Sequence, residues 1–201
     1  KDGQPPKDGG DGTGMVDFKG ERRTNQTHQS SPAPEAKLMR RGNGQPAKRC
    51  FGGHALMENR SGLCADLQIT DSRMSEPKVA QQLLSRLRRK RIHAKTLGAD
   101  KGYHSKAFAE HLREHHIRPH IARIDGRKTL GLDARTTRHA SYWVSQRTRK
   151  RVEEIFGWLK TVGGMRKSRV IGIARTQMQA YLAASAYNLL RMARLVSIGT
   201  S

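Results

Sequence analysis

The sequence predicts an α/β fold, and three features of the chain carry that prediction. Two apolar runs, 50–58 and 63–70, flank the four turn residues 59–62 and predict a β-hairpin. Two further short runs, 94–99 and 117–124, predict strands. Apolar residues recur at helical spacing between and after these runs, which predicts helices over 76–90, 104–116, 175–196 and within 144–167.

Composition points to a polyanionic partner. Lys and Arg total 39 against 17 Asp and Glu in 201 residues, a formal net charge of +22. Nucleic acid is the first candidate partner. A membrane surface is the second, but no apolar run reaches the roughly 18 residues needed to cross a bilayer. Aromatic residues are only 5% of the chain, so base stacking on an aromatic platform is not the binding mode we expect.

The chain divides by composition into two parts. Residues 1–49 are Gly/Pro-rich and basic and lack periodic apolar residues, so we expect a loop or disordered arm there and a folded domain over 50–201. A basic arm lying on DNA phosphates and a solvated linker both fit the first part. Cys50 and Cys64 are too few for a disulfide framework and fit a reduced, cytosolic setting.

The stretch 144–167 organises the chain. An apolar stripe at i, i+3, i+4 and i+7 predicts an amphipathic helix: Val152, Ile155, Phe156 and Leu159. At 100° per residue, Arg149, Glu153 and Lys160 lie within roughly 40° of one another, beside that stripe. We expect Glu153 at the rim of the core between cations, which suits a metal and a phosphate. An i,i+4 Arg–Glu ion pair on a surface helix is the simpler alternative.

Four other polar residues have simple interpretations. Asp100 ends the strand 94–99 and precedes Gly102, at an edge where open α/β sheets gather ligands, although such Asp residues also make turns. Asp66, inside the strand 63–70, is expected to face solvent. His111 and His115 stand at i,i+4, but no carboxylate or Cys accompanies them at a familiar zinc spacing.

Two regions carry no site prediction. Residues 125–143 read as a basic loop. In the last helix we expect an apolar stripe to pack into the core: Met178, Leu182, Leu189 and Met192.

The pattern Arg149-x3-Glu153-x6-Lys160 resembles the signature helix of DDE transposases encoded by bacterial insertion sequences of the IS-four/IS-five group. Four phrases are similar to that family: GGHALMENRSGL at 52–63, GADKGYHSKAF at 98–108, TTRHASYWVSQR at 136–147 and FGWLKTVGGMRKSR at 156–169. The likeness extends over nearly the whole chain from Glu21 onward. The family usually has a Tyr three residues before the Arg, where this chain has Gln146.

The resemblance implies an RNase H-like fold, a mixed five-stranded sheet with helices on both faces. It implies that Asp100 and Glu153 are the second and third catalytic carboxylates and ligands of Mg²⁺, since that ion prefers hard oxygen donors. In the family two Mg²⁺ ions serve DNA strand cleavage and strand transfer. Four cations are expected to hold DNA phosphates: Arg149, Lys160, Arg166 and Lys167.

The resemblance also implies double-stranded DNA as the partner, both transposon ends and target, with no membrane. We allow for self-association on that DNA. The implied location is the bacterial cytoplasm, at the nucleoid.

The first catalytic Asp of the family has no evident counterpart. The candidates lie in Gly-rich sequence without a strand pattern: Asp2, Asp8, Asp11 and Asp17. In the family that Asp sits on the central strand of the sheet, and without the strand each unpaired buried backbone group costs about 1–3 kcal/mol. We therefore expect a transposase fragment with an incomplete RNase H-like sheet, catalytically incomplete and binding one Mg²⁺ weakly.

Two alternatives stay open. A non-enzymatic basic DNA-binding protein would tolerate loss of Asp100 and Glu153, and a nuclease using these two carboxylates alone would cut DNA with Mg²⁺.

Overall fold

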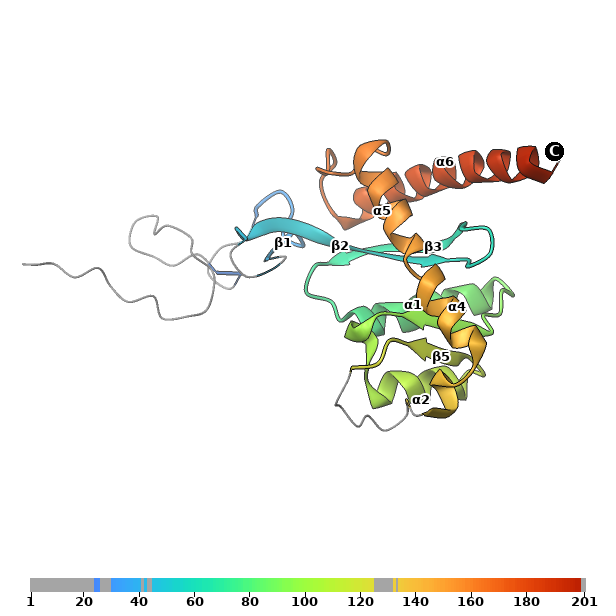
Figure 1. Ribbon diagram of the computed structural model, residues 1–201. Helices are drawn as coiled ribbons and strands as arrows, with labels where there is room; N and C mark the ends of the chain where they lie inside the picture. The colour runs from blue at the N-terminus through green and yellow to red at the C-terminus, as the bar shows by residue number, and fades with distance from the viewer. Residues whose placement is uncertain are drawn as a thin grey trace, which may run out of the picture.

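The computed structural model describes residues 24–25, 30–40, 42, 45–124, 132 and 134–199. Within them the chain is a mixture of strands and helices, as the sequence predicts (Figure 1). The strands are β1 (Lys37–Met39), β2 (Lys48–Met57), β3 (Cys64–Asp71), β4 (Thr96–Ala99) and β5 (Arg118–Ile121). The helices are α1 (Glu76–Arg89), the 3₁₀ turn η1 (Lys101–Tyr103), α2 (Lys106–Glu114), α3 (Ala134–Thr137), α4 (Ala140–Thr148), α5 (Arg151–Thr161) and α6 (Ile173–Gly199).

The strands form two sheets. β1, β2 and β3 are antiparallel in the order β1-β2-β3, and β4 and β5 form a parallel pair. β2 and β3 are the predicted hairpin, paired from Phe51 opposite Asp71 to Met57 opposite Cys64. Among the described residues no backbone pairing joins the two sheets.

Local chemistry sets the helix ends. Pro77 stands in the first turn of α1, where its missing N–H costs nothing. Ser105 caps α2 by accepting a hydrogen bond from the Phe108 backbone at 3.3 Å. Arg91 and His116, just past α1 and α2, adopt positive φ angles of 59° and 58°, which turns the chain toward the following strand.

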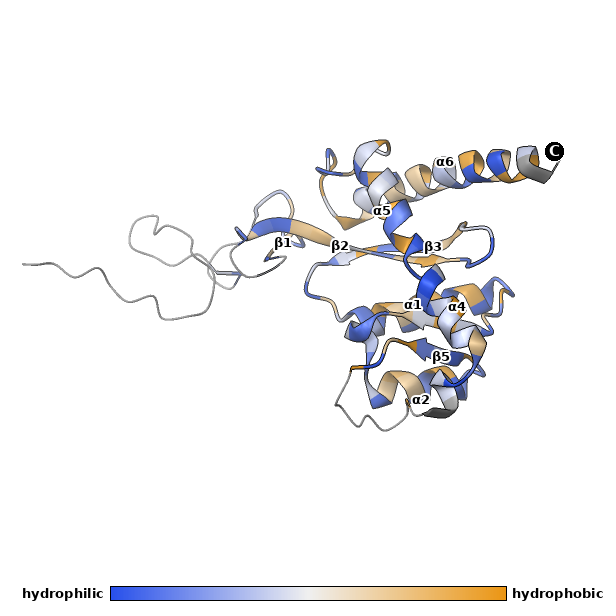
Figure 2. Ribbon diagram, in the orientation of Figure 1, coloured by the Kyte–Doolittle hydropathy of each residue, from blue (hydrophilic) through white to orange (hydrophobic). Residues whose placement is uncertain are grey.

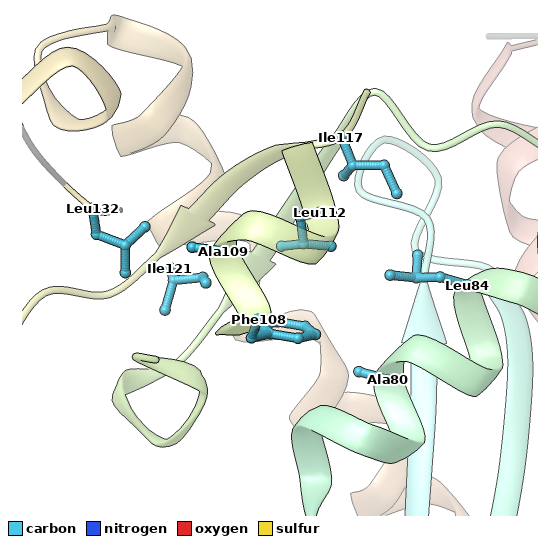
Figure 3. Packing of buried hydrophobic residues seen from close by; sticks show 8 residues of the cluster. All are labelled: Ala80, Leu84, Phe108, Ala109, Leu112, Ile117, Ile121 and Leu132. Carbon is cyan, nitrogen blue, oxygen red and sulfur yellow. The ribbon is translucent and has the colours of Figure 1, made fainter. Parts of the chain in front are cut away.

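Buried side chains form two clusters. The first joins α1, α2 and β5, and in Figure 3 the ring of Phe108 lies between Ile121 of β5 and Ala80 of α1. Burial of a side chain such as Phe108, which is 1% exposed, contributes about 1.5–3 kcal/mol. The second cluster lies between the β2–β3 hairpin, α5 and α6 and includes Leu67, Ile155 and Leu159. Of the stripe predicted for α5, Ile155 and Leu159 are confirmed as core and Phe156 packs against them partly buried, whereas Val152 is half-buried outside the cluster.

Helix α6 packs through a different face from the one the sequence suggested. Its buried residues are Thr176, the small Ala180 and Ala184, and Tyr187. The amide of Gln177 bonds the backbone of Leu67 and Ile69, and the amide of Asn188 bonds both backbone groups of Cys64. The side-chain amides thus satisfy the open edge of β3.

The stripe expected in the core is exposed: Met178 61%, Leu182 67%, Leu189 64% and Met192 42%. Figure 2 shows apolar residues recurring along the visible length of α6. Both faces of the helix are apolar, so hydropathy could not choose between them. The small residues allow a closer approach to the sheet, and the two amides match its edge.

Asp66 is buried, and the expectation that it faces solvent is wrong. Its side chain is 2% exposed and accepts two hydrogen bonds from Arg86, at 2.9 and 3.0 Å. Because a buried carboxylate needs a counter-charge, Arg86 and Asp66 tie α1 to β3.

The remaining differences are local. Residues 134–137 and the first part of α4, 140–143, are helical where a loop was expected, because only Tyr142 and Ser145 of α4 are buried and the apolar period is weak. The rest of α4, 144–148, falls within the stretch that was predicted to hold a helix. β1 forms within the arm expected to lack regular structure and pairs with the start of β2. The four Asp residues of 1–23 lie outside the described residues. None of the described helices has the length and apolarity to cross a membrane.

Candidate functional site

Asp100 stands at the carboxyl end of β4. It caps η1 by accepting a hydrogen bond from the Gly102 backbone through Oδ1, at 2.8 Å, and it is exposed. Ligands of open α/β sheets gather at this kind of strand end. The turn therefore holds one carboxylate oxygen in place while the group stays open to solvent.

A second carboxylate, Glu76, borders the same turn. A Cβ built on Gly102 would lie 3.1 Å from Oδ1 of Asp100 and 3.7 Å from Oε2 of Glu76. Tyr103 lies beside both, and its pKa is raised by burial and then by the two negative charges. The sequence had no signal for Glu76, since an acid in the first turn of a helix is ordinary.

Helix α4 is fixed to the β4–β5 sheet by polar contacts. The imidazole of His120 on β5 shares a 2.7 Å hydrogen bond with the Ser145 hydroxyl. Gln146 donates to the His120 carbonyl, and Tyr142 donates to the Ile121 carbonyl at 3.2 Å. These contacts set the place and rotation of the C-terminal end of α4.

This packing brings Arg149 to β4. A Cβ on Gly98 would lie 3.3 Å from the Ser145 carbonyl oxygen and 3.6 Å from the Arg149 Cβ, so the absence of a side chain allows the approach. Gly98 is two residues before Asp100. The strand that ends in the carboxylate therefore runs past the base of the Arg149 side chain.

Arg149 is held by Gln146, not by Glu153. Its Nε donates to the Gln146 amide oxygen at 3.0 Å. Within the described part of the chain no ion pair joins Arg149 and Glu153, so the simple i,i+4 pair is absent. Arg149 and Lys150 form a turn between α4 and α5 rather than part of one helix.

Glu153 is exposed on α5, not at the rim of the core. It lies roughly 200° around the helix from Ile155, whose side chain is fully buried. Arg151, two residues before Glu153, donates to the carbonyls of Asn59 and Arg60 and so anchors the start of α5 to the β2–β3 turn. Glu153 therefore projects from a helix whose position is well defined.

The other predicted phosphate ligands lie further along α5. Lys160 is exposed two turns after Glu153, roughly 10 Å along the helix axis. Arg166 and Lys167 are exposed beyond the C-terminal end of α5, after the turn at Gly164, which has a φ of 67°. These three cations are therefore spread along α5 and beyond its end and do not gather at Asp100.

The donor chemistry fits a divalent cation only in part. Mg²⁺ is commonly bound through one or two carboxylates and keeps several waters, which Asp100 and the nearby Glu76 can satisfy. No three His, Cys, Asp or Glu side chains among the described residues cluster closely enough to hold a metal ion. A site with three carboxylates is therefore not assembled from these residues.

Comparison with known proteins gives a consistent result. A family model described as "Transposase DDE domain" matches residues 16–189. The transposase for insertion sequence element IS1106 of Neisseria meningitidis serogroup B is 30% identical over 140 residues, which is 70% of this chain and 46% of that protein. The chain thus spans less than half the length of this curated relative. No solved structure matches.

Proposed function

Because the chain belongs to the DDE transposase family, we propose that it binds double-stranded DNA and supplies Asp100 and Glu153 to metal-dependent cleavage and transfer of DNA strands. The observation that carries the proposal is the packing at Gly98. It sets Arg149, a cation suited to a phosphate, beside the strand that ends in the Asp100 carboxylate. Arg149 can bind a phosphodiester, and the Asp100 carboxylate can bind a hydrated metal ion beside it.

The basic surface supplies the affinity. Arg149 and Lys160 would hold DNA phosphates through charge-assisted hydrogen bonds, with Arg166 and Lys167 contacting the backbone further along. The net charge of +22 adds attraction that is independent of sequence and falls with salt. A chain with these properties would lie on the DNA of the bacterial nucleoid.

The carboxylates would act as metal ligands. When bound, Mg²⁺ ions would activate the attacking oxygen and stabilise the leaving one. Asp100 is held by Gly102 and Glu153 by the anchored start of α5, so both groups are presented by fixed backbone.

The fold we propose is RNase H-like with the first, central strand supplied from outside the described residues. β1 pairs with β2 only at residues 48–50, so the same edge of β2 is unpaired over 51–57. The separation of the two sheets supports this proposal, since one strand between that edge and β4 would join them. We therefore propose that the chain alone binds DNA and does not cut it.

DNA binding and cleavage test this proposal separately. Fluorescence anisotropy on a labelled duplex should give an affinity that falls steeply with salt, and Arg149→Gln or Lys160→Gln should each reduce the log–log salt slope by about 0.9. Lys106→Gln, which removes an exposed cation of α2, is the matched control and should leave the slope within about 0.3 of its original value if Lys106 makes no phosphate contact.

Supercoiled plasmid incubated with Mg²⁺ should stay uncut by the chain alone. Nicking that disappears in Asp100→Asn or Glu153→Gln, but not in Glu110→Gln, would instead establish a self-sufficient nuclease. Cleavage restored by adding the rest of the transposase, and lost again with Asp100→Asn, is the expected result. Restored cleavage that Asp100→Asn leaves intact would contradict the assigned role.

We also propose that a second copy of the chain pairs along α6. The exposed apolar residues Met178, Leu182, Leu189, Met192 and Val196 follow a 4-7-3-4 spacing, the heptad repeat that seats one helix on another. Sedimentation with and without duplex should show a dimer on DNA that Leu182→Asp with Leu189→Asp abolishes. A monomer under both conditions, or a dimer unaffected by these substitutions, would contradict this proposal.

A further inference from the structure

The first residues of β2 extend past the end of the β2–β3 hairpin. Pairing between β2 and β3 begins at Phe51, opposite the last residue of β3, Asp71. Residues 48–50 pair instead with β1, on the other edge of β2. In Figure 1 this two-stranded segment, β1 with residues 48–50, projects away from the helices, and it is named the β-ribbon below.

Side chains hold the β-ribbon in a defined position. The side-chain amide of Asn25 accepts a hydrogen bond from the Leu38 N–H at 2.8 Å and donates to the Leu38 carbonyl at 3.1 Å. The hydroxyl of Ser72, just after β3, donates to the Lys37 carbonyl at 3.5 Å. The first contact satisfies the backbone groups of Leu38, and the second ties β1 to the end of the hairpin.

The two faces of the β-ribbon both carry a cation. Residues directly opposite each other in an antiparallel pair point to the same face, and successive residues point to opposite faces. Leu38 lies opposite Arg49, and Met39 lies opposite Lys48. Arg49 therefore points to one face and Lys48 to the other.

These two charges are available to an anionic partner. Lys48 and Arg49 are exposed, and no ion pair within the described part of the chain involves either one. Lys37 differs, because it is half-buried near Asp71, whose pKa is lowered by its hydrogen bonds with Arg73 and to a smaller extent by the Lys37 charge. Figure 2 shows the start of β2 as strongly hydrophilic.

The dimensions of the β-ribbon match one groove of DNA. Its two strands lie about 4.8 Å apart, and the major groove of B-DNA, about 12 Å wide, admits a two-stranded ribbon, whereas the minor groove is only about 6 Å wide. Each groove has a phosphate backbone on both sides. A cation on each face lets one ribbon contact both backbones, and the exposed Met39 offers an apolar contact for thymine methyl groups on the groove floor.

We propose that the β-ribbon enters the major groove of double-stranded DNA, with Arg49 on the phosphates of one strand and Lys48 on those of the other. The inference rests on the proposed DNA binding and adds a contact outside the candidate site, on residues given no role there. It also chooses, for residues 37–50, the DNA-contacting arm over the solvated linker.

Cys50 is a natural probe of the groove. It lies opposite Lys37, on the same face as Lys48, and is partly exposed, whereas Cys64 is buried. A duplex with a disulfide-capped tether on N4 of one cytosine presents that tether in the major groove, and the same tether on N2 of a guanine lies in the minor groove. The Cys50 thiol should displace the cap and cross-link to the major-groove tether in clearly higher yield.

Two controls accompany the cross-linking. Cys50→Ser should abolish the cross-link. Glu110→Cys added to Cys50→Ser places a thiol on an exposed position of α2, away from the β-ribbon, and should cross-link weakly and equally to the two tethers.

Salt dependence supplies an independent readout of the two cations. Lys48→Gln and Arg49→Gln should each reduce the log–log salt slope of duplex binding by about 0.9, because each removes one phosphate contact. Lys78→Gln, which removes an exposed cation of α1, is the matched control and should leave the slope unchanged. Lys48→Arg should keep the original slope, since the charge remains.

The outcomes separate this inference from the proposed function. A slope that responds to Arg149→Gln and Lys160→Gln but not to Lys48→Gln or Arg49→Gln overturns the β-ribbon and leaves the proposed function standing. The reverse pattern, with cross-linking confined to the major groove, supports the β-ribbon and overturns the roles of Arg149 and Lys160. Equal yields from the two grooves, or no cross-link to either tether, overturn the β-ribbon whatever the slopes.

Discussion

The ion pair of Asp66 and Arg86 makes a stability prediction that follows directly from geometry. Oδ2 of Asp66 lies 2.9 Å from Nε of Arg86, and Oδ1 accepts both from Arg86 at 3.0 Å and from the Leu67 backbone at 2.9 Å. The Asp66 side chain is 2% exposed and that of Arg86 is 25% exposed. Asp66→Ala would remove the counter-charge of Arg86 and one acceptor of a buried backbone N–H.

Removing one partner of a buried ion pair costs about 3–5 kcal/mol, because the other charge stays desolvated without compensation. Arg86 keeps some contact with water and a hydrogen bond to the Leu67 carbonyl at 3.0 Å. We therefore expect the lower end, about 3 kcal/mol of unfolding free energy. That is a large share of the 5–15 kcal/mol that typically stabilises a domain.

Urea unfolding followed by far-ultraviolet circular dichroism measures the change in unfolding free energy. The slope of that free energy against urea concentration should be the same in each variant, which shows that the unfolded states are comparable. Glu110→Ala breaks an exposed pair with Lys106 and should change stability by less than about 0.5 kcal/mol. Asp66→Leu with Arg86→Leu should recover part of the loss, because no buried charge remains although the Leu67 N–H still lacks its acceptor. A loss below about 1 kcal/mol for Asp66→Ala, or no recovery in the double variant, would refute the reasoning.

Three further predictions are tested by unfolding measurements or by thiol labelling. Burial lowers the pKa of the His120 imidazole below 6.5, so the neutral ring contributes stability above pH 6.5 that is lost as the pH falls through the folded pKa. His120→Gln should therefore flatten the dependence of the unfolding free energy on pH. An unchanged dependence would contradict this prediction. Burial raises the pKa of the Cys64 thiol to about 11. A thiol reagent at pH 8 should therefore react with Cys50 first and with Cys64 only in denaturant. Equal reaction rates at the two cysteines would contradict the packing. Asn188→Leu should cost about 1–3 kcal/mol by unpairing the Cys64 backbone, against less than about 0.5 kcal/mol for Leu190→Ala at an exposed position of α6. Equal costs would argue against the amide contacts.

Local patterns were sufficient for most of the secondary structure. The turn residues 59–62 and the runs beside them predicted the β2–β3 hairpin, and the period of 3.6 residues predicted α1, α2, α5 and α6. The first part of α4, 140–143, was predicted as a loop because the helix is held by Ser145, Gln146 and Tyr142 through hydrogen bonds to β5. Hydropathy carries no record of such contacts.

The candidate site divides in the same way. The spacing of Arg149, Glu153 and Lys160 and the strand-terminal Asp100 singled out residues that the transposase family match spans. Their surroundings were not predictable, since Glu76 and Gln146 approach through contacts between distant segments. The exposure of Glu153 was misjudged because the buried face of α5 centres on Ile155 and Leu159, and Glu153 lies more than 100° around the helix from both at roughly 100° per residue.

By itself the sequence determined the order of the β2–β3 hairpin, the strands β4 and β5 and the helices α1, α2, α5 and α6, together with the strong positive charge and the family. Each of these depends on local spacing or on composition. Only the tertiary structure decided that Asp66 is buried against Arg86, that α6 packs through its alanines, and that β1 pairs with the start of β2 in a ribbon with a cation on each face. Those outcomes depend on which of several equivalent faces meets a matching surface, and that matching exists only once the segments are folded together.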